Sequence, residues 1–252
     1  MGRETATAGG GGSVALRLKG VVVITGHYGC GKSEIAIHLA VHHRRQGLRV
    51  GLADLDVVNP YFRSREAAER LERLGIEVVA PAPALRRSEL PAVSPAVSGL
   101  IRRPLDLVVL DAGGDPAGAT VLASLGAAFA ARPPAVLMVV NPFRPETATV
   151  PRCLALRGAI EQAARLAVTG LAGNPNLIDE TGPQEVLEGR RFLAALSIAS
   201  GLPLVFLAVA EGLLARLDPA AWEEPVLPIR RQLVPPWEKA RDLQEPEGDP
   251  PA

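Results

Sequence analysis

The chain has 252 residues, of which 48% are hydrophobic, and its 27 basic residues are balanced by 27 acidic ones. This length fits one large α/β domain, and the charge balance excludes a global attraction to nucleic acid or to an acidic membrane. Two cysteines exclude a disulfide framework, and no apolar run approaches the roughly 18 residues that a transmembrane helix needs. We therefore expect a cytoplasmic protein with no strong sign of nucleic-acid or membrane binding.

The predicted elements alternate between short apolar strands and helices. In chain order, we expect strands at residues 21–25, 48–53, 76–80, 105–110, 135–140, 166–171 and 204–208. Helices are expected at 33–45, 65–74, 147–164 and 185–199. Fully apolar strands separated by helices are typical of a parallel sheet that is covered on both faces. The sequence therefore predicts an α/β protein with a doubly wound, mostly parallel sheet.

Composition predicts the limits of this domain. Residues 1–13 are small, polar and glycine-rich, and residues 237–252 are charged and proline-rich, so both segments are expected to be flexible tails. The domain between them covers residues 14–236. Within it, the proline-rich stretch 81–95 is expected to be a loop. Doubly wound sheets bind ligands at the carboxyl ends of their strands, so polar residues that follow a strand are candidates for function.

A phosphate-binding motif follows the first predicted strand. Residues 26–33 read GHYGCGKS and match the P-loop pattern GxxxxGK[ST], with a strand before and a helix after. The glycines let backbone N–H groups point at phosphate oxygens, and the start of the helix adds positive charge. Lys32 is expected to contact the β- and γ-phosphates, and Ser33 to ligate Mg²⁺. The predicted nucleotide-binding residues here are Gly26, His27, Tyr28, Gly29, Cys30, Gly31, Lys32, Ser33 and Glu34.

An acidic partner for the metal ends the fourth predicted strand. Asp111 follows four apolar residues, and a carboxylate in this place holds the water shell of Mg²⁺ in P-loop enzymes. Gly113 and Gly114 come next, and glycine there allows a backbone N–H to approach the γ-phosphate, as in nucleotide-sensing switches. The sequence thus predicts Ser33 and Asp111 as metal residues and the two glycines as nucleotide-binding residues.

Carboxylates also follow the second predicted strand. Asp54 and Asp56 are two residues apart in an extended segment, so they are expected to point the same way. Two functional roles are open to them: orienting the attacking water, or joining the outer shell of the metal. The alternative is that both are ordinary solvated carboxylates of a loop. The predicted catalytic set is therefore Lys32, Asp54, Asp56 and Asp111.

Two arginines follow this strand as well. Arg63 and Arg65 are expected near the γ-phosphate, where either could stabilise transition-state charge within one chain or across a dimer. The alternative is that both cap or solvate the helix that follows.

Together, these motifs resemble the CobQ/CobB/MinD/ParA class of P-loop proteins. The resemblance rests on residues 26–33, on Asp54 and Asp56, and on residues 111–114, and it spans residues 21–208. Residues 56–63 and 141–145 are similar to a bacterial branch of that class consisting of ATP-binding proteins. The resemblance implies a seven- or eight-stranded sheet, Mg²⁺-dependent ATP binding and a nucleotide-controlled homodimer.

The chain departs from the partitioning and division ATPases of this class in one place. Those proteins carry a second lysine directly after the first P-loop glycine, and that lysine reaches the partner's nucleotide. Here the position is His27, and an imidazole does not replace a fixed ammonium. Such ATPases often end in a membrane-binding helix, and four prolines between residues 225 and 236 exclude one across that stretch.

Base recognition is expected after a late strand. Asn174 follows the sixth predicted strand, and its amide can both donate to and accept from adenine. The competing reading is guanine, because Asn176 and Asp179 have N-x-x-D spacing; residues 179–181 also fit a helix-capping turn. We favour ATP over GTP. Asn141 lies at the same edge of the sheet and could be structural.

The two cysteines have two readings each. Cys30, inside the P-loop, is either a thiol whose pKa is lowered by backbone dipoles, and thus sensitive to redox or metals, or a small residue at a variable position. Cys153 is expected to be packed in the core, although copies of either cysteine could form a metal site in a dimer.

Three functions fit these residues. The first is an ATPase that acts as a switch for an unidentified protein partner. The second is a compact ATP-dependent ligase or kinase for a small metabolite. The third is a GTP-dependent metal-insertion factor. We favour the first, because the chain leaves no room for the glutaminase domain of the amidating ligases.

Overall fold

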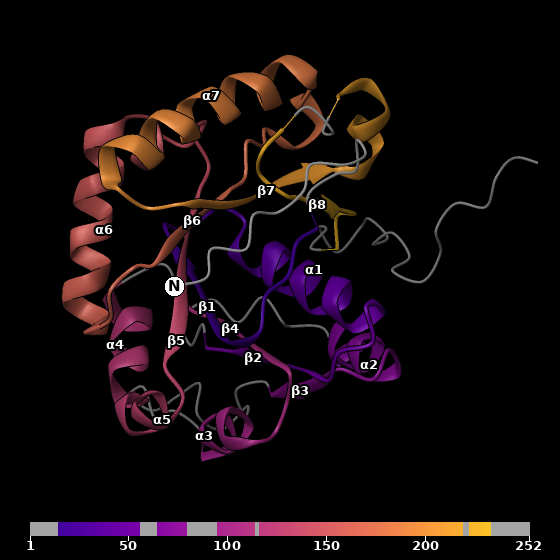
Figure 1. Ribbon diagram of the computed structural model, residues 1–252, viewed down its shortest axis with the longest axis vertical. Coiled ribbons are helices and arrows are strands. Elements are labelled where there is room, and N and C mark those ends of the chain that lie inside the picture. The colour runs from indigo at the N-terminus through magenta and orange to yellow at the C-terminus, as the bar shows by residue number, and fades with distance from the viewer. Residues whose placement is uncertain (1–14, 56–64, 80–94, 114–115, 219–221, 233–252) are drawn as a thin grey trace, which may run out of the picture.

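The computed structural model describes residues 15–55, 65–79, 95–113, 116–218 and 222–232 (Figure 1). Its described residues form one eight-stranded sheet with the order β3-β2-β4-β1-β5-β6-β7-β8, in which every neighbouring pair is parallel. The strands are β1 (Gly20–Gly26), β2 (Val50–Asp54), β3 (Glu77–Val79), β4 (Leu107–Asp111), β5 (Pro134–Val140), β6 (Gly170–Gly173), β7 (Leu204–Ala210) and β8 (Val226–Ile229). The predicted doubly wound parallel sheet is confirmed.

Helices connect these strands. They are α1 (Lys32–Arg45), α2 (Arg65–Arg73), α3 (Pro95–Arg102), α4 (Pro116–Ser124), α5 (Gly126–Ala131), α6 (Val150–Ala164) and α7 (Pro183–Ser200), with short 3-10 turns η2 (Pro145–Thr147), η3 (Ile178–Glu180) and η4 (Glu211–Arg216). None of the helices in the described part of the chain is both long and apolar enough to cross a lipid bilayer.

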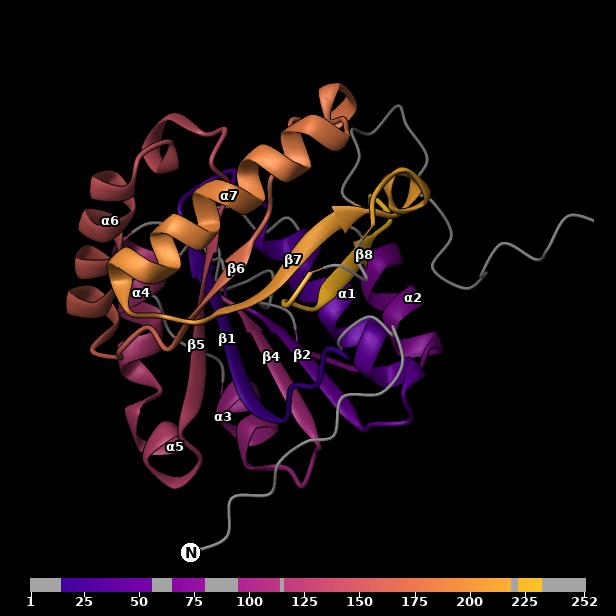
Figure 2. The ribbon, with the colours of Figure 1, turned by 45° about the horizontal axis from the view of Figure 1, so that its top comes forward.

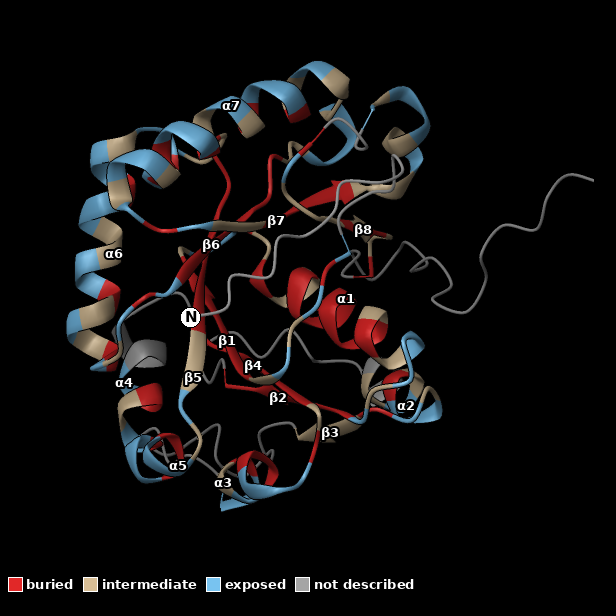
Figure 3. Ribbon diagram, viewed as in Figure 1, coloured by how far each residue is buried: buried red, intermediate tan, exposed pale blue. Residues whose placement is uncertain are grey.

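The sheet separates two apolar cores. Side chains from α1 and α2 pack on one face, and side chains from α3 to α7 pack on the other. Figure 2 shows α1 and α2 on one side of the strands and α4, α5 and α6 on the opposite side. Helix α1 is buried along most of its length, whereas α6 and α7 expose their outer faces (Figure 3). The helix that begins at the phosphate loop is therefore the most enclosed of the layer.

The connections diverge beside β1. After β1 the chain passes through α1 to β2, which lies toward the β3 edge of the sheet. After β4 it passes through α4 and α5 to β5, which lies toward the β8 edge. Ligands of open α/β sheets bind outside the carboxyl ends of the strands at such a divergence. The topology therefore places the site at the ends of β1 and β4.

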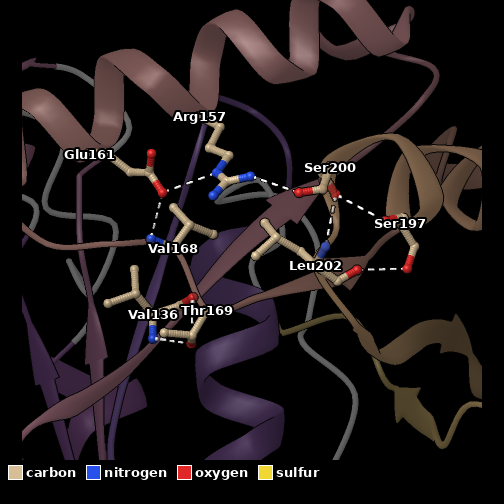
Figure 4. A network of polar contacts seen from close by, with 8 residues as sticks. All are labelled: Val136, Arg157, Glu161, Val168, Thr169, Ser197, Ser200 and Leu202. Carbon is tan, nitrogen blue, oxygen red and sulfur yellow. Dashed lines mark hydrogen bonds and ion pairs between the residues drawn. The ribbon is translucent and has the colours of Figure 1, made fainter.

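Strand β6 begins later than the pattern predicts. We expected it from residue 166, but the ladder starts at Gly170. Side chains engage the preceding residues instead: Glu161 accepts from the backbone N–H of Val168 at 2.9 Å, and the Thr169 hydroxyl oxygen accepts from that of Val136 at 2.9 Å (Figure 4). A run of apolar residues alone does not show which of them pair with a neighbouring strand and which are held by hydrogen bonds to side chains.

Four elements were not predicted. Strand β8 contains Pro228, which is tolerated because β8 is the last strand of the sheet. Helices α4 and α5 are rich in alanine and glycine and lack a polar face that would mark them as amphipathic. Helix α3 starts at Pro95, the last residue of the predicted loop, and residues 80–94 lie outside the described part of the chain.

Two histidines of α1 hold distant backbone segments. His38 Nδ1 donates to the Glu34 carbonyl at 2.9 Å, so its Nε2 accepts from the backbone N–H of Arg230 at 2.9 Å. His43 makes the same pair of contacts, to the Leu39 carbonyl and from the backbone N–H of Leu18. Both contacts require neutral imidazoles. Burial lowers the pKa of His38 from 6.5 to about 4, against smaller opposing effects of the hydrogen bonds with Glu34 and Arg230.

This arrangement predicts acid sensitivity. His38 stays neutral in the folded protein but takes up a proton below about pH 6.5 when unfolded, so unfolding binds a proton between about pH 6.5 and 4. The free energy of unfolding should fall by about 3 kcal/mol from this group as the pH drops through that window. Arg45 and Glu211 act on the same imidazole in opposite directions. His38→Gln keeps an acceptor that does not titrate, so its urea unfolding should depend less on pH; parallel pH profiles would contradict the assignment.

Candidate nucleotide site

The phosphate loop runs from the end of β1 to the start of α1. Gly31 precedes the helix with φ 93°, in the left-handed region that favours glycine. A Cβ at Gly31 would lie 2.2 Å from Asn174 Nδ2, and one at Gly26 would lie 2.5 Å from the carbonyl oxygen of Val139. Both glycines are therefore fixed by close neighbours on β5 and after β6, which set the shape of the loop.

Lys32 lies at the first position of α1 and is buried. Its Nζ donates to the carbonyl of His27 at 3.1 Å, across the loop. The ammonium and the N-terminus of α1 place positive charge at one point, which suits a polyphosphate. Ser33 follows in the same first turn.

Two buried aspartates lie side by side on neighbouring strands. Asp54 ends β2, Asp111 ends β4, and the two are direct partners in the parallel register, with Ile24 of β1 as the next partner of Asp111. Ile24 belongs to the core beneath α1. Since residues in register on parallel strands point to the same face, both carboxylates point to the face that α1 covers. The predicted catalytic residues Lys32, Asp54 and Asp111 are thus brought to one edge of the sheet.

Other predicted residues lie near this edge or outside the described chain. Gly113 is buried two residues after β4. Asp56, Gly114 and Arg63 lie outside the described residues, and the side chain of Arg65 is likewise not described.

Asn174 contacts the phosphate loop directly. Its side chain is buried, and Nδ2 donates to the carbonyl of Cys30 at 2.8 Å, while its backbone N–H donates to Val140. From the sequence, we predicted a contact of this amide with the base alone. The contact with the loop was not predicted, because the two residues are 144 positions apart and no local pattern links them.

The neighbouring polar residues build the loop itself. Asn141 donates from Nδ2 to the carbonyl of Asn176 and accepts from the backbone N–H of Phe143, so its role is structural. Asn176 Oδ1 accepts from the backbone N–H of Ile178, which has φ 63°. The side chain of Asp179 is 93% exposed and lies 3.9 Å from Arg231 Nη1.

Three residues of the predicted phosphate segment face other groups. Glu34 Oε1 accepts from the backbone N–H of Gln232 at 2.6 Å. His27 Nδ1 lies 3.1 Å from the carbonyl of Tyr28, and the side chain of Tyr28 is 58% exposed at the surface of the loop. The predicted contacts of these residues with a nucleotide stay predictions.

The cysteines are packed thiols. Cys30 is fully buried, and this burial raises its pKa more than Lys32 and backbone N–H groups lower it. The reading of Cys30 as a low-pKa, reactive thiol is therefore wrong. Cys153 is buried as expected, its thiol lies 3.4 Å from the carbonyl of Thr147, and burial raises its pKa to about 11.

Residues 19–117 match the sequence family described as ATPase MipZ, which is of the ParA/MinD type of P-loop ATPases. The matched segment includes the phosphate loop, Asp54 and Asp111. The match confirms the resemblance to ParA/MinD-type proteins. No curated protein matches the chain significantly.

Solved structures show the same fold. Cell division protein FtsY from Thermotoga maritima matches with a TM-score of 0.56 and 22% identity, over 83% of this chain and 68% of that one. A nucleotide-binding protein from Archaeoglobus fulgidus in complex with ADP matches with 0.50 and 21%, over 80% and 86%. Chloroplast FtsY from Physcomitrella patens matches with 0.52 and 24%, over 79% of this chain and 61% of its own. At these identities the likeness establishes the fold alone.

The contact between Asn174 and Cys30 can be tested without a nucleotide. Asn174→Ala would leave the buried carbonyl of Cys30 without its donor, so the free energy of unfolding should fall by about 1–3 kcal/mol in urea titrations. Asn176→Ala is the matched control, because the side-chain hydrogen bonds of Asn176 among the described residues stay within its own loop. An Asn174→Ala protein as stable as wild type would contradict the contact.

Proposed function

We propose that the protein is a Mg²⁺-dependent ATP-binding protein that hydrolyses ATP slowly and acts as a nucleotide switch for a protein partner. The observation that carries the proposal is the pairing of Asp54 with Asp111 on the face that α1 covers, where Lys32 and Ser33 begin the helix. Phosphates would neutralise Lys32 and the helix N-terminus, and a divalent cation would neutralise the carboxylates.

The residues present fit Mg²⁺. Two buried carboxylates side by side repel each other, and hard oxygen donors are the ligands that this ion prefers. Ser33 would be the direct protein ligand, and Asp111 would hold the water shell. When bound, Mg²⁺ supplies charge neutralisation of the β- and γ-phosphates. In this proposal, Asp54 and Asp56 orient the attacking water, and a γ-phosphate engages the backbone at Gly113 and Gly114.

Adenine is the base we favour. Guanine recognition needs a carboxylate that faces the base, and the candidate, Asp179, is almost fully exposed and lies near Arg231. Its companion Asn176 serves its own loop. Asn174 gives one amide N–H to Cys30, and its Oδ1 can accept from the N6 amino group of adenine.

The partner would read the state of the loop after β4. A second copy of this chain is one such partner; His27 lies where related ATPases place the lysine that crosses a dimer, so an arginine such as Arg63 or Arg65 would have to supply that charge.

Slow turnover that a partner protein accelerates supports the switch. Rapid ATP consumption with one small metabolite would favour the ligase or kinase, and a GTP preference lost in Asp179→Ala would favour the metal-insertion factor.

The phosphate assignment is tested by Lys32→Ala. Removing the buried ammonium leaves the phosphates without their main counterion, so ATP affinity by calorimetry should fall about 100-fold or more. Lys19→Ala is the matched control, because Lys19 precedes β1 at the opposite edge of the sheet. Unchanged ATP binding in Lys32→Ala would overturn the site.

The metal assignment is tested by Asp111→Asn. This change keeps the size of the side chain but removes its charge, so Mg²⁺-dependent ATP turnover should fall about tenfold or more, with a smaller effect on nucleotide affinity. Equal Mg²⁺ titration curves for both proteins would contradict the role of Asp111.

The base is tested by thermal shift with ATP, GTP and their diphosphates at equal Mg²⁺. Stabilisation grows with ligand concentration relative to its dissociation constant, so the preferred base gives the larger shift. We expect the adenine nucleotides to do so; a larger shift with the guanine nucleotides would reverse the assignment.

A further inference from the structure

Three residues after β8 cross to the phosphate-binding helix. We call residues 230–232 the strap. The backbone N–H of Arg230 donates to His38 Nε2 at 2.9 Å, and the backbone N–H of Gln232 donates to Glu34 Oε1 at 2.6 Å. The strap residue numbers rise as the α1 numbers fall, so the strap runs toward the start of α1. It reaches the helix one residue after Ser33.

The side chains of the strap bind two further loops at the same edge. Arg230 forms an ion pair with Glu211 of η4, which follows β7, and Arg231 lies 3.9 Å from Asp179 of η3, which follows β6. Gln232 Nε2 also donates back to the carbonyl of Arg230 at 2.7 Å, which stiffens the segment. The strap therefore joins the first turns of α1 to the loops that follow β6 and β7.

The strap also supports the geometry of α1. His38 Nδ1 bonds the carbonyl of Glu34 while its other nitrogen holds Arg230, and Glu34 itself holds Gln232. The strap thus binds the conformation of α1 in which Lys32 and Ser33 occupy the first turn. An α1 whose first turn opened would lose the contact of Glu34 with Gln232 and would disturb the bond from His38 Nδ1 to the Glu34 carbonyl.

We propose that the strap is energetically coupled to the nucleotide site through α1, with His38 and Glu34 as positioning residues. This inference rests on the proposed nucleotide binding. Docking of the strap and binding of Mg²⁺-nucleotide both select the ordered first turn of α1, so each favours the other. Because such coupling is reciprocal, loosening the strap weakens nucleotide binding, and nucleotide binding tightens the strap.

The test compares His38→Leu with His42→Leu. The first removes the acceptor for Arg230, whereas His42 is a half-buried neighbour on the same helix that contacts Gln46 and the backbone of Leu16 instead of the strap. In calorimetry with Mg²⁺-ADP, the dissociation constant should rise about three- to tenfold in His38→Leu. It should stay within about twofold of wild type in His42→Leu. His38→Gln, which keeps an acceptor, should restore most of the affinity.

Hydrogen exchange supplies a second readout that a purely structural role would not move. Mg²⁺-ADP should slow exchange of the amides of Arg230 and Gln232 in the wild type and fail to do so in His38→Leu. If His38→Leu does not fold, Gln232→Pro removes the second strap donor without altering α1, and the same loss of affinity is expected.

The outcomes separate the two proposals. Absence of Mg²⁺-nucleotide binding by the wild type would overturn the proposed function. Binding by the wild type, with equal affinity in His38→Leu or Gln232→Pro and unchanged exchange at the strap, would overturn the coupling and leave the nucleotide site intact.

Discussion

The register of three parallel strands is the constraint on which the site depends. Ile24, Asp111 and Asp54 lie in one row across β1, β4 and β2, on the face that α1 covers. This row fixes two carboxylates beside each other at the same sheet edge as a buried lysine and a helix N-terminus. Acidic and basic side chains are then enclosed at one edge of the sheet. A metal–polyphosphate complex would complement them, because its cation matches the carboxylates and its phosphates match the lysine.

Two glycines of the phosphate loop pack closely against residues on and after the strands on the other side of β1. Gly26 lies against β5, and Gly31 lies against Asn174, so the phosphate loop is shaped by the two strands to the right of β1 in the sheet order. Its acidic partners come from the two strands to the left. The strands on both sides of β1 in the sheet thus contribute residues to the candidate site.

Much of this was accessible from the sequence because it rests on short, local patterns. The GxxxxGKS motif, the aspartate after a run of four apolar residues, and the second apolar strand ending at Asp54 each predict their place without knowledge of the rest. Strand order and register were not predicted, because they depend on which distant strands pair with each other. The parts that were missed depend on contacts between distant residues: Asn174 with Cys30, and the strap with α1. The alanine-rich helices α4 and α5 were missed for another reason, since they bury small side chains and carry no periodic contrast.

The two histidines of α1 have a mechanical consequence. His43 holds Leu18, close to the first described residue, and His38 holds Arg230, close to the last, so both ends of the described chain are anchored on one helix. A shift of α1 would therefore be transmitted both to the segment that leads into β1 and to the segment that follows β8. Two segments at opposite ends of the described chain thus meet on the helix that begins at Lys32.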